Sequence, residues 1–232
     1  MVVVSGRVRG VRRLGPPSSG ARLPDVAVKR LPVYLRALGQ LRAEGEDIVS
    51  SARLARQTGL TSEQIRKDLA MLGGFGTRGV GYKISVLSDS IRRVLGLEQE
   101  VPVALVGAGH LGTALTRYNE SRNQQPRIAA IFDTAPDKVG AELGGKPIRG
   151  LEDLDSTVRA LGIRMAIIAV PVLAAQEVAN RLVAAGCDVL LNFAPKRLDL
   201  PEQVRVHNVD LAMELEALAY YVRPELQGGP VP

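Results

Sequence analysis

The stretch PVALVGAGHLG at residues 102–112 decides the fold of the C-terminal half of the chain. An apolar run predicts a buried β-strand, and glycines follow it directly at the spacing GxGxxG. In a dinucleotide-binding turn the first glycine allows a tight turn, the second admits a pyrophosphate, and the third lets the next helix pack on the strand. The stretch therefore predicts a strand, a helix and, between them, a phosphate-binding turn formed by Gly107, Ala108, Gly109, His110, Leu111 and Gly112.

Short apolar segments alternate with amphipathic ones on the C-terminal side of this turn. We predict strands at 102–106, 127–132, 164–170, 188–192 and 204–207, and helices at about 110–121, 151–161 and 172–185. Such alternation is typical of a parallel sheet covered by helices on both faces. The prediction for residues 99–208 is an α/β Rossmann domain, a doubly wound parallel sheet.

An acidic residue closes the second predicted strand. Asp133 ends RIAAIFD, 21 residues after Gly112, where a carboxylate accepts hydrogen bonds from the adenosine ribose. Because a carboxylate repels a 2′-phosphate, this position favours NAD(H) over NADP(H). The alternative interpretation is an N-cap before Thr134-Ala135-Pro136.

The N-terminal half has a different pattern, and we predict a winged-helix domain over residues 25–98. Apolar residues at 28, 31, 35 and 38 recur at helical spacing to about Ala43; a second helix begins at Ser50 or Ser51 and stops at Gly59. A third helix, Ser62 to about Leu72, is followed by a glycine-rich hairpin at 73–87 with a strand from Tyr82, and a further helix is expected at 88–97.

Charge is divided unevenly between the two halves. Residues 1–98 hold 17 Lys/Arg against 8 Asp/Glu, a net charge of +9, whereas residues 99–232 have a net charge of −3. Gln64, Arg66 and Lys67, with Asp68, are predicted to point outward from the third helix, and Arg78 lies at the tip of the wing. These groups favour DNA, with Arg78 suited to an A·T-rich minor groove; solvated charge is the alternative for each.

Several functions are disfavoured by what the sequence lacks. No apolar run approaches the roughly 20 residues of a membrane-spanning helix, and the arginines within residues 1–24, a predicted flexible basic tail, precede no signal-like apolar block. We therefore expect a cytoplasmic protein. The single Cys187 lies in an apolar run and predicts core packing, with a redox-active thiol as the alternative.

The sequence also lacks the residues that dehydrogenase chemistry needs. The two histidines, His110 and His207, are placed in the phosphate turn and at a strand end, and no tyrosine is followed four residues later by lysine. A dehydrogenase needs such a proton donor or acceptor beside the hydride. We expect no catalytic residues and no metal site.

Five segments, in order and spacing, resemble the Rex family of redox-sensing transcriptional repressors. They are QIRKDL at 64–69, GTRGVGY at 76–82, VGAGHLG at 106–112, LNFAP at 191–195 and NVD at 208–210. The resemblance extends from about Val26 to Tyr220. It implies a homodimer that binds a palindromic operator when NADH is low and leaves it when NADH binds.

The resemblance also implies roles for particular residues. The helix within 209–224, here 210–222, would swap to the partner subunit, leaving 225–232 as a tail. Tyr118 and Asp210 would lie near the nicotinamide, with Arg36 pairing with that aspartate in the DNA-bound form. Further predicted cofactor contacts are Lys138, Val170, Pro171, Asn192, Phe193 and Ala194, and further DNA contacts are Arg30, Ser62, Thr77, Gly79 and Tyr82.

Three other interpretations stay open on the sequence. In the first, the chain is a small NAD-dependent oxidoreductase whose basic N-terminus docks a partner. It would instead be a nucleotide or acyl-CoA binding module, because the Rossmann half with its NFAP loop also resembles the CoA-binding domain of succinyl-CoA synthetases. Or it would bind DNA constitutively, with NAD(H) as a structural component.

Overall fold

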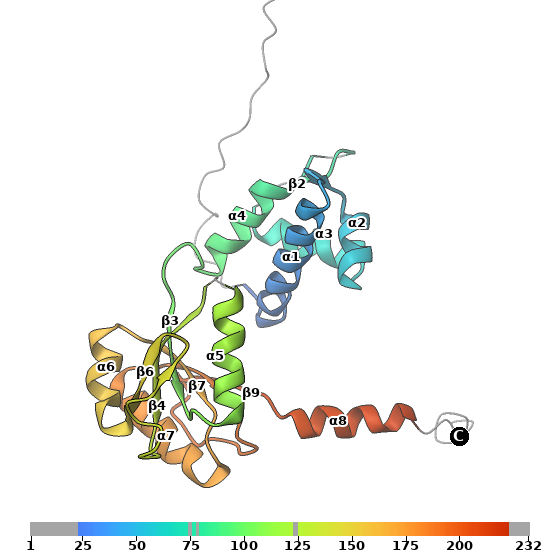
Figure 1. Cartoon of the computed structure of the whole chain (residues 1–232). Coiled ribbons are helices and arrows are strands. Elements are labelled where there is room, and N and C mark those ends of the chain that lie inside the picture. Colours follow the sequence, from blue (N-terminus) through green and yellow to red (C-terminus); the bar gives the residue numbers. More distant parts are fainter. Residues whose placement is uncertain (1–22, 74–75, 78, 123–124, 223–232) are drawn as a thin grey trace, which may run out of the picture. The chain divides into compact units, whose positions relative to one another are not determined.

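The structure, a computed structural model, describes residues 23–73, 76–77, 79–122 and 125–222. The chain forms two compact units, residues 1–98 and residues 99–232, each with its own apolar core. Figure 1 labels most of the elements of both units. Most of the predicted N-terminal tail, and the whole of the predicted C-terminal tail, lie outside the described residues.

The described residues of unit 1 form four helices and a two-stranded ribbon. The helices are α1 (Asp25–Ala43), α2 (Ser51–Thr58), α3 (Ser62–Met71) and α4 (Ile84–Val94), and the strands are β1 (Ile48–Val49) and β2 (Tyr82–Lys83). The hydroxyl of Ser50 caps α2, and that of Thr61 caps α3 by accepting from the amide of Gln64 at 3.1 Å. Between these helices Gly59 adopts a φ of +72°, which ends α2 and starts the tight turn.

The C-terminal part of unit 1 differs from the prediction. The expected strand from Tyr82 is only two residues long, and it pairs antiparallel with β1, a strand that the sequence did not suggest. The next helix begins at Ile84 instead of Ser88. Ile84, Leu87 and Ile91 are all buried, so their spacing of three and four follows the helical period, although KISVL also alternates like a strand.

The first helix buries a slightly different face from the predicted one. Val28 is exposed, while Tyr34 is fully buried on the same helix. The core of unit 1 unites residues of all four helices, among them Leu31, Leu38, Leu54, Ile65, Leu69, Leu87 and Ile91.

Unit 2 contains a seven-stranded sheet in the order β5-β6-β4-β3-β7-β8-β9. The strands are β3 (Pro102–Val106), β4 (Arg127–Asp133), β5 (Glu142–Leu143), β6 (Lys146–Gly150), β7 (Met165–Ile168), β8 (Val189–Asn192) and β9 (Arg205–Asn208). All neighbours are parallel except the short edge pair β5 and β6. This is the predicted doubly wound sheet, with two added strands whose mixed polarity shows no periodic signal.

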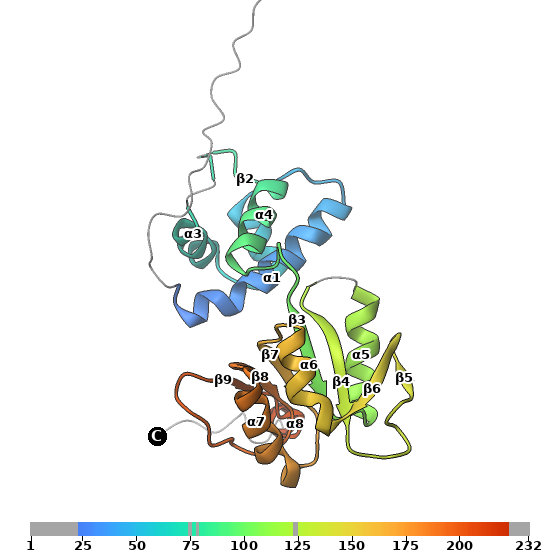
Figure 2. The same cartoon turned by 90° about the vertical axis from the view of Figure 1, so that its left-hand side faces the viewer.

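Helices cover the two faces of this sheet. They are α5 (His110–Arg122), the 3-10 turn η1 (Leu151–Asp153), α6 (Leu154–Ala160) and α7 (Val172–Ala185). Figures 1 and 2 show α5 on one face and α6 with α7 on the other. Alternate strand residues fill the two layers: Ala104 and Val106 belong to the larger core with α6 and α7, and Leu105 to the smaller one.

The chain continues into α8 (Leu211–Ala219) and the 3-10 turn η2 (Tyr220–Val222), a slightly later helix start than the predicted Asp210. Asp210 is the N-cap, and its carboxylate accepts from the amides of Ala212 and Met213. No residue of α8 is buried. Within the described residues no helix has the length and apolarity to cross a membrane.

Candidate dinucleotide site and nucleic-acid interface

The turn after β3 contains two glycines that other residues could not replace and a third that lies in open space. Gly107 has a φ of +103°, and a Cβ added there would overlap the carbonyl oxygen of Ala169. A Cβ on Gly112 would overlap the carbonyl oxygen of Gly107, because α5 packs directly on the turn. At Gly109 an added Cβ would meet nothing within 4 Å. The turn thus keeps open space above Gly109 beside the N-terminus of α5, which suits a pyrophosphate.

Asp133 connects the end of β4 to this turn. One carboxylate oxygen accepts from the amide of Ala135 at 2.9 Å, and the other accepts from the amide of Ala108 at 2.7 Å and from Lys138 at 3.2 Å. Burial raises the pKa of Asp133, but the backbone hydrogen bonds from Ala135 and Ala108, together with Lys138, outweigh it and lower the pKa below its usual value. The carboxylate therefore stays ionised at neutral pH.

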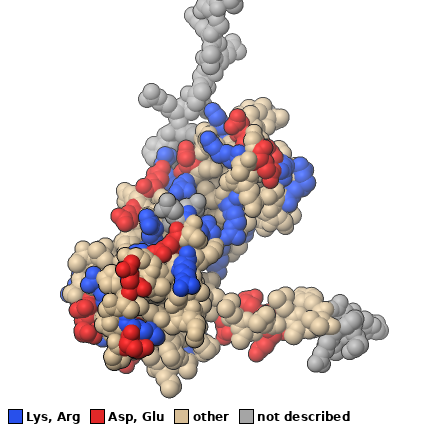
Figure 3. Space-filling model, in the orientation of Figure 1, with Lys and Arg blue, Asp and Glu red and all other residues tan. Residues whose placement is uncertain are grey.

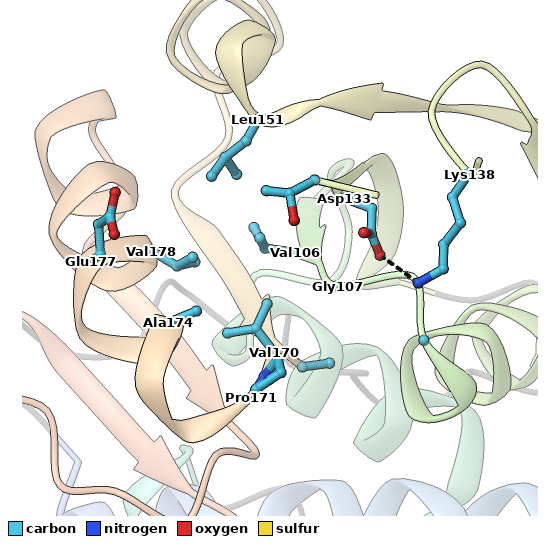
Figure 4. Close-up of a pocket in the computed structure, with 13 residues that line it drawn as sticks. Val106, Gly107, Asp133, Lys138, Leu151, Val170, Pro171, Ala174, Glu177 and Val178 are labelled. Carbon is cyan, nitrogen blue, oxygen red and sulfur yellow. Dashed lines mark hydrogen bonds and ion pairs between the residues drawn. The ribbon is translucent and has the colours of Figure 1, made fainter. Parts of the chain in front are cut away.

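A cavity of about 420 Å³ opens beside Asp133, a volume in the range of ligand sites. Figure 4 shows the Asp133–Lys138 pair on one side and α7 with Glu177 on the other. Six predicted cofactor residues line it: Gly107, Gly109, Asp133, Lys138, Val170 and Pro171. Seven lining residues were not predicted: Val106, Thr134, Leu151, Ala169, Ala174, Glu177 and Val178. The last three lie at helical spacing on the first turns of α7, a signal that a search along that helix would have found.

The other predicted cofactor residues lie outside this cavity. Asn192 is fully buried; its amide nitrogen donates to the carbonyl oxygens of Ala194 and Lys196 and to Asn208 Oδ1 at 2.9 Å. These bonds tie the loop after β8 to the end of β9, next to Asp210. Tyr118 lies on α5, is 57% exposed, and accepts a hydrogen bond from Arg122.

Unit 1 brings α3 and the wing together around a second hollow. It also measures about 420 Å³ and is lined by Ser50, Ser51, Arg66, Gly76, Thr77, Gly79, Val80, Gly81 and Tyr82. Arg66 donates to Ser51 Oγ at 3.2 Å, and Thr77 and Gly81 close the wing turn with backbone hydrogen bonds. Arg36 and Lys67 are exposed, and Ser62 is half-buried. Arg78, the predicted wing tip, lies outside the described residues.

The predicted outward position of Asp68 is wrong. Its side chain is buried, and it accepts hydrogen bonds from Arg30 and Tyr34 of α1 and from Gln64 one turn earlier on α3. Arg30, which was predicted to contact DNA, donates from two guanidinium nitrogens to this carboxylate, at 2.6 and 2.8 Å. The cause is the packing of α1 against α3, which the sequence pattern of α3 alone does not reveal.

Two simpler expectations concern cysteine and metal. Cys187 is buried at 1% exposure, and burial raises the pKa of its thiol to about 11, so the core interpretation is confirmed. Among the residues that the structure describes, no three His, Cys, Asp or Glu side chains gather as a metal site would need.

Known proteins resemble both units. Residues 22–70 match the family model described as a putative DNA-binding protein N-terminus, and residues 98–196 match the CoA binding domain. The redox-sensing transcriptional repressor Rex of Natranaerobius thermophilus is 48% identical, with 88% of this chain and 93% of the relative covered. The Rex of Bacillus subtilis (strain 168) is 40% identical over 88% of this chain and 94% of the relative.

Solved structures agree with these relatives. The crystal structure of RSP in complex with beta-NAD+ and operator DNA superimposes with a TM-score of 0.82 at 31% identity, covering 89% of this chain and 95% of that chain. RSP in complex with beta-NADH gives 0.78 at 30% identity, covering 89% and 97%. At this identity over nearly their full length, the chain belongs to the Rex family of redox-sensing transcriptional repressors.

Proposed function

We propose that this protein is a repressor that binds operator DNA through unit 1 and leaves it when NADH binds unit 2. The proposal rests on the presence of two candidate sites in one chain. One is the glycine turn with the ionised Asp133, and the other is helix α3 beside the wing. The relatives named Rex at 40–48% identity, and RSP with NAD+ and operator DNA, support it. The assigned parts are a winged-helix domain at 25–98, a Rossmann domain at 99–208 and a swapped helix at 209–224.

The residues of unit 2 fit NAD(H). Pyrophosphate would occupy the open space at Gly109, and Asp133 would accept hydrogen bonds from the adenosine ribose while repelling a 2′-phosphate. In a doubly wound sheet the dinucleotide crosses the carboxyl ends of the strands, so the nicotinamide would lie toward β7 and β8. When bound, NAD(H) supplies the redox signal, because only the oxidised nicotinamide ring is positively charged.

CoA is the second candidate ligand, because the family model that matches residues 98–196 is a CoA binding domain. The geometry favours NAD(H) over it. Asp133 would bind the ribose of NAD(H) through the ribose hydroxyls. In CoA one of these hydroxyls carries a negative 3′-phosphate, which the ionised carboxylate would repel. Calorimetry with NADH and CoA side by side separates the two: we expect binding heat from NADH alone.

A homodimer with exchanged α8 helices is proposed from the apolar surfaces that the chain leaves uncovered. Leu215 is 68% exposed, and Leu211, Met213, Leu218 and Tyr220 are exposed as well. Figure 3 shows α8 as an uncharged surface apart from its acidic side chains. On the face of the sheet that α5 covers, neighbouring strands pair Leu105 with Ile167, Ile167 with Leu191, and Leu191 with His207. Along this row the exposure increases: Leu105 is buried, Ile167 and Leu191 are half-buried, and His207 is exposed. Burying both surfaces in a partner would be favourable.

The switch would run through the segment between β8 and α8. Asn192 ties the loop on the nicotinamide side to Asn208, and Asp210 follows two residues later as the cap of α8. In the proposal Asp210 exchanges partners between Tyr118 and Arg36, and NADH favours the state that cannot bind DNA. A ligand shifts such an equilibrium only by its differential affinity for the two states, so NAD+ must favour that state less.

We propose no catalytic activity, no metal requirement, a cytoplasmic location and a palindromic, A·T-rich operator. The ionisable residues that line the cavity are Asp133, Lys138 and Glu177, and the first two are paired with each other. None of them is a histidine or tyrosine of the kind that dehydrogenases use. Palindromy follows from a two-fold dimer, and A·T preference from Arg78 in a narrow minor groove.

A mobility-shift titration tests the function. The dimer is titrated onto a palindromic duplex at fixed salt, with NADH, NAD+ or neither. We expect a shifted complex that NADH abolishes and excess NAD+ restores. A complex that persists at saturating NADH would leave a constitutive DNA binder, and steady loss of NADH absorbance with a carbonyl substrate would revive the oxidoreductase.

A further inference from the structure

The buried carboxylate of Asp68 is saturated with hydrogen bonds. Its side chain has no exposed surface, in the middle of α3. One oxygen accepts from Arg30 Nε and Tyr34 Oη, both at 2.6 Å, and the other from Arg30 Nη2 at 2.8 Å. All three donors belong to α1, so this carboxylate joins α3 to α1.

The remaining hydrogen bond involves a residue predicted to contact DNA. Gln64 Nε2 donates to Asp68 Oδ1 at 2.8 Å, from one turn earlier on α3. Although burial raises the pKa of Asp68, the hydrogen bonds from Arg30, Tyr34 and Gln64 lower it below its usual value, so the carboxylate is ionised. An ionised carboxylate only accepts hydrogen bonds. The amide of Gln64 must therefore turn its NH2 group toward Asp68, which directs the carbonyl oxygen Oε1 away from it.

Gln64 occupies the position from which a recognition helix contacts bases. Its backbone amide donates to the capping hydroxyl of Thr61, so it lies in the first turn of α3. Its neighbours Arg66 and Lys67 are exposed on the same helix. Helices of this class insert their N-terminal residues into the major groove. Gln64 is half-buried, and because its NH2 group is bound to Asp68, the side-chain group left to accept a hydrogen bond from a base is Oε1.

We propose that Asp68 is a positioning residue that sets Gln64 to accept a hydrogen bond from a base, and so selects an exocyclic amine at one operator position. The amine is adenine N6 or cytosine N4, the major-groove donors, whereas guanine O6 and thymine O4 are acceptors that Oε1 repels. The inference rests on the proposed operator binding. An unrestrained glutamine would present either end of its amide, so the selectivity comes from the buried charge beneath it.

A purely structural role for Asp68 makes a different prediction. If Asp68 only holds α3 on α1, its loss weakens binding to every operator by the same factor. If it orients Gln64, its loss removes the preference at one base pair and its symmetry mate. The readout is therefore the pattern of dissociation constants across operator variants, not the affinity for one operator.

The experiment uses the full chain and an operator duplex with symmetric substitutions at each base pair, at fixed salt. Gln64→Ala is expected to reduce discrimination at one base pair by about tenfold, toward the low end for a base contact. Asp68→Asn should reduce it at the same base pair, and the double variant no further. Tyr34→Phe is the matched control: it removes one hydrogen bond from Asp68 but leaves Gln64 in place, and should keep the preference.

Base analogues test the same inference without altering the protein. Replacing the selected amine by hydrogen should weaken wild-type binding by about tenfold and leave Gln64→Ala binding unchanged. If that base is adenine, replacing its N7 by CH should cost the wild type little, because Nε2 is held by Asp68. Uniform loss across all operators for Asp68→Asn, or unchanged preference for Gln64→Ala, would overturn the inference. Failure of the wild type to bind any operator would instead overturn the proposed function.

Discussion

Asp68 in unit 1 and Asp133 in unit 2 are both ionised carboxylates with lowered pKa values, yet they are held in opposite ways. Asp68 has no exposed side-chain surface and accepts only from side chains, most of them on another helix. Asp133 has an 11% exposed side chain and accepts mainly from backbone amides of two adjoining turns. The first joins α3 to α1, and the proposed function uses it indirectly; the second lines the cavity that is proposed to bind NAD(H).

The largest expected effect of this difference is on stability. Asp68→Ala leaves the Arg30 guanidinium partly buried without its partner, and we expect unit 1 to lose about 2–4 kcal/mol, somewhat below the cost of breaking a fully buried pair. Guanidinium unfolding followed by circular dichroism measures it. Asp133→Ala, with local partners and some solvent access, should cost about 1–2 kcal/mol. Equal losses would contradict the contrast.

Ligand affinity should show the reverse order. Asp133→Ala removes the proposed ribose acceptor. We expect NADH affinity to fall by about tenfold, the contribution of one or two hydrogen bonds, and the preference for NADH over NADPH to decrease. Calorimetry with both cofactors measures this. Asp68→Ala is the control, because it belongs to the other unit and should leave NADH affinity unchanged.

The loss of stability at acid pH follows from the lowered pKa values of Asp68 and Asp133. A carboxylate whose pKa is lower in the folded than in the unfolded state stabilises the fold above the unfolded value of about 3.9, and that contribution is lost as the pH falls through the folded pKa. Both aspartates have this sign. We expect the free energy of unfolding to be constant near neutral pH and to decrease below about pH 4. In the Asp68→Asn variant this decrease should be smaller. An unchanged decrease in that variant would argue against the Asp68 assignment.

The smallest effect is expected at the thiol. Cys187 is buried and the pKa of its thiol is raised to about 11, so it stays protonated at neutral pH. Native protein should react negligibly with an alkylating reagent, and Cys187→Ala should leave the NADH response unchanged. Rapid labelling of the folded protein would reopen a thiol-based sensor.

Local patterns predicted the strands and the glycine turn that border the cavity of unit 2. The glycines at 107, 109 and 112, the strand before them and Asp133 after the next strand are recognisable because they follow the order and spacing of a dinucleotide-binding pattern. The cap at Thr61 and the glycine stop at Gly59 are local in the same sense. The pairing of β1 with β2 was missed, since two-residue strands have no periodicity to detect.

From its sequence alone the chain could be assigned a Rossmann unit, a winged-helix unit and a family, because these depend on residue types at short, regular spacings. Packing alone revealed that Asp68 is buried and that Gln64 is held by it. Arg30 and Asp68 lie 38 residues apart, and only the contact of α1 with α3 brings them together. An aspartate among exposed charges gives no local sign of such a partner, since burial is a property of the neighbours that surround it.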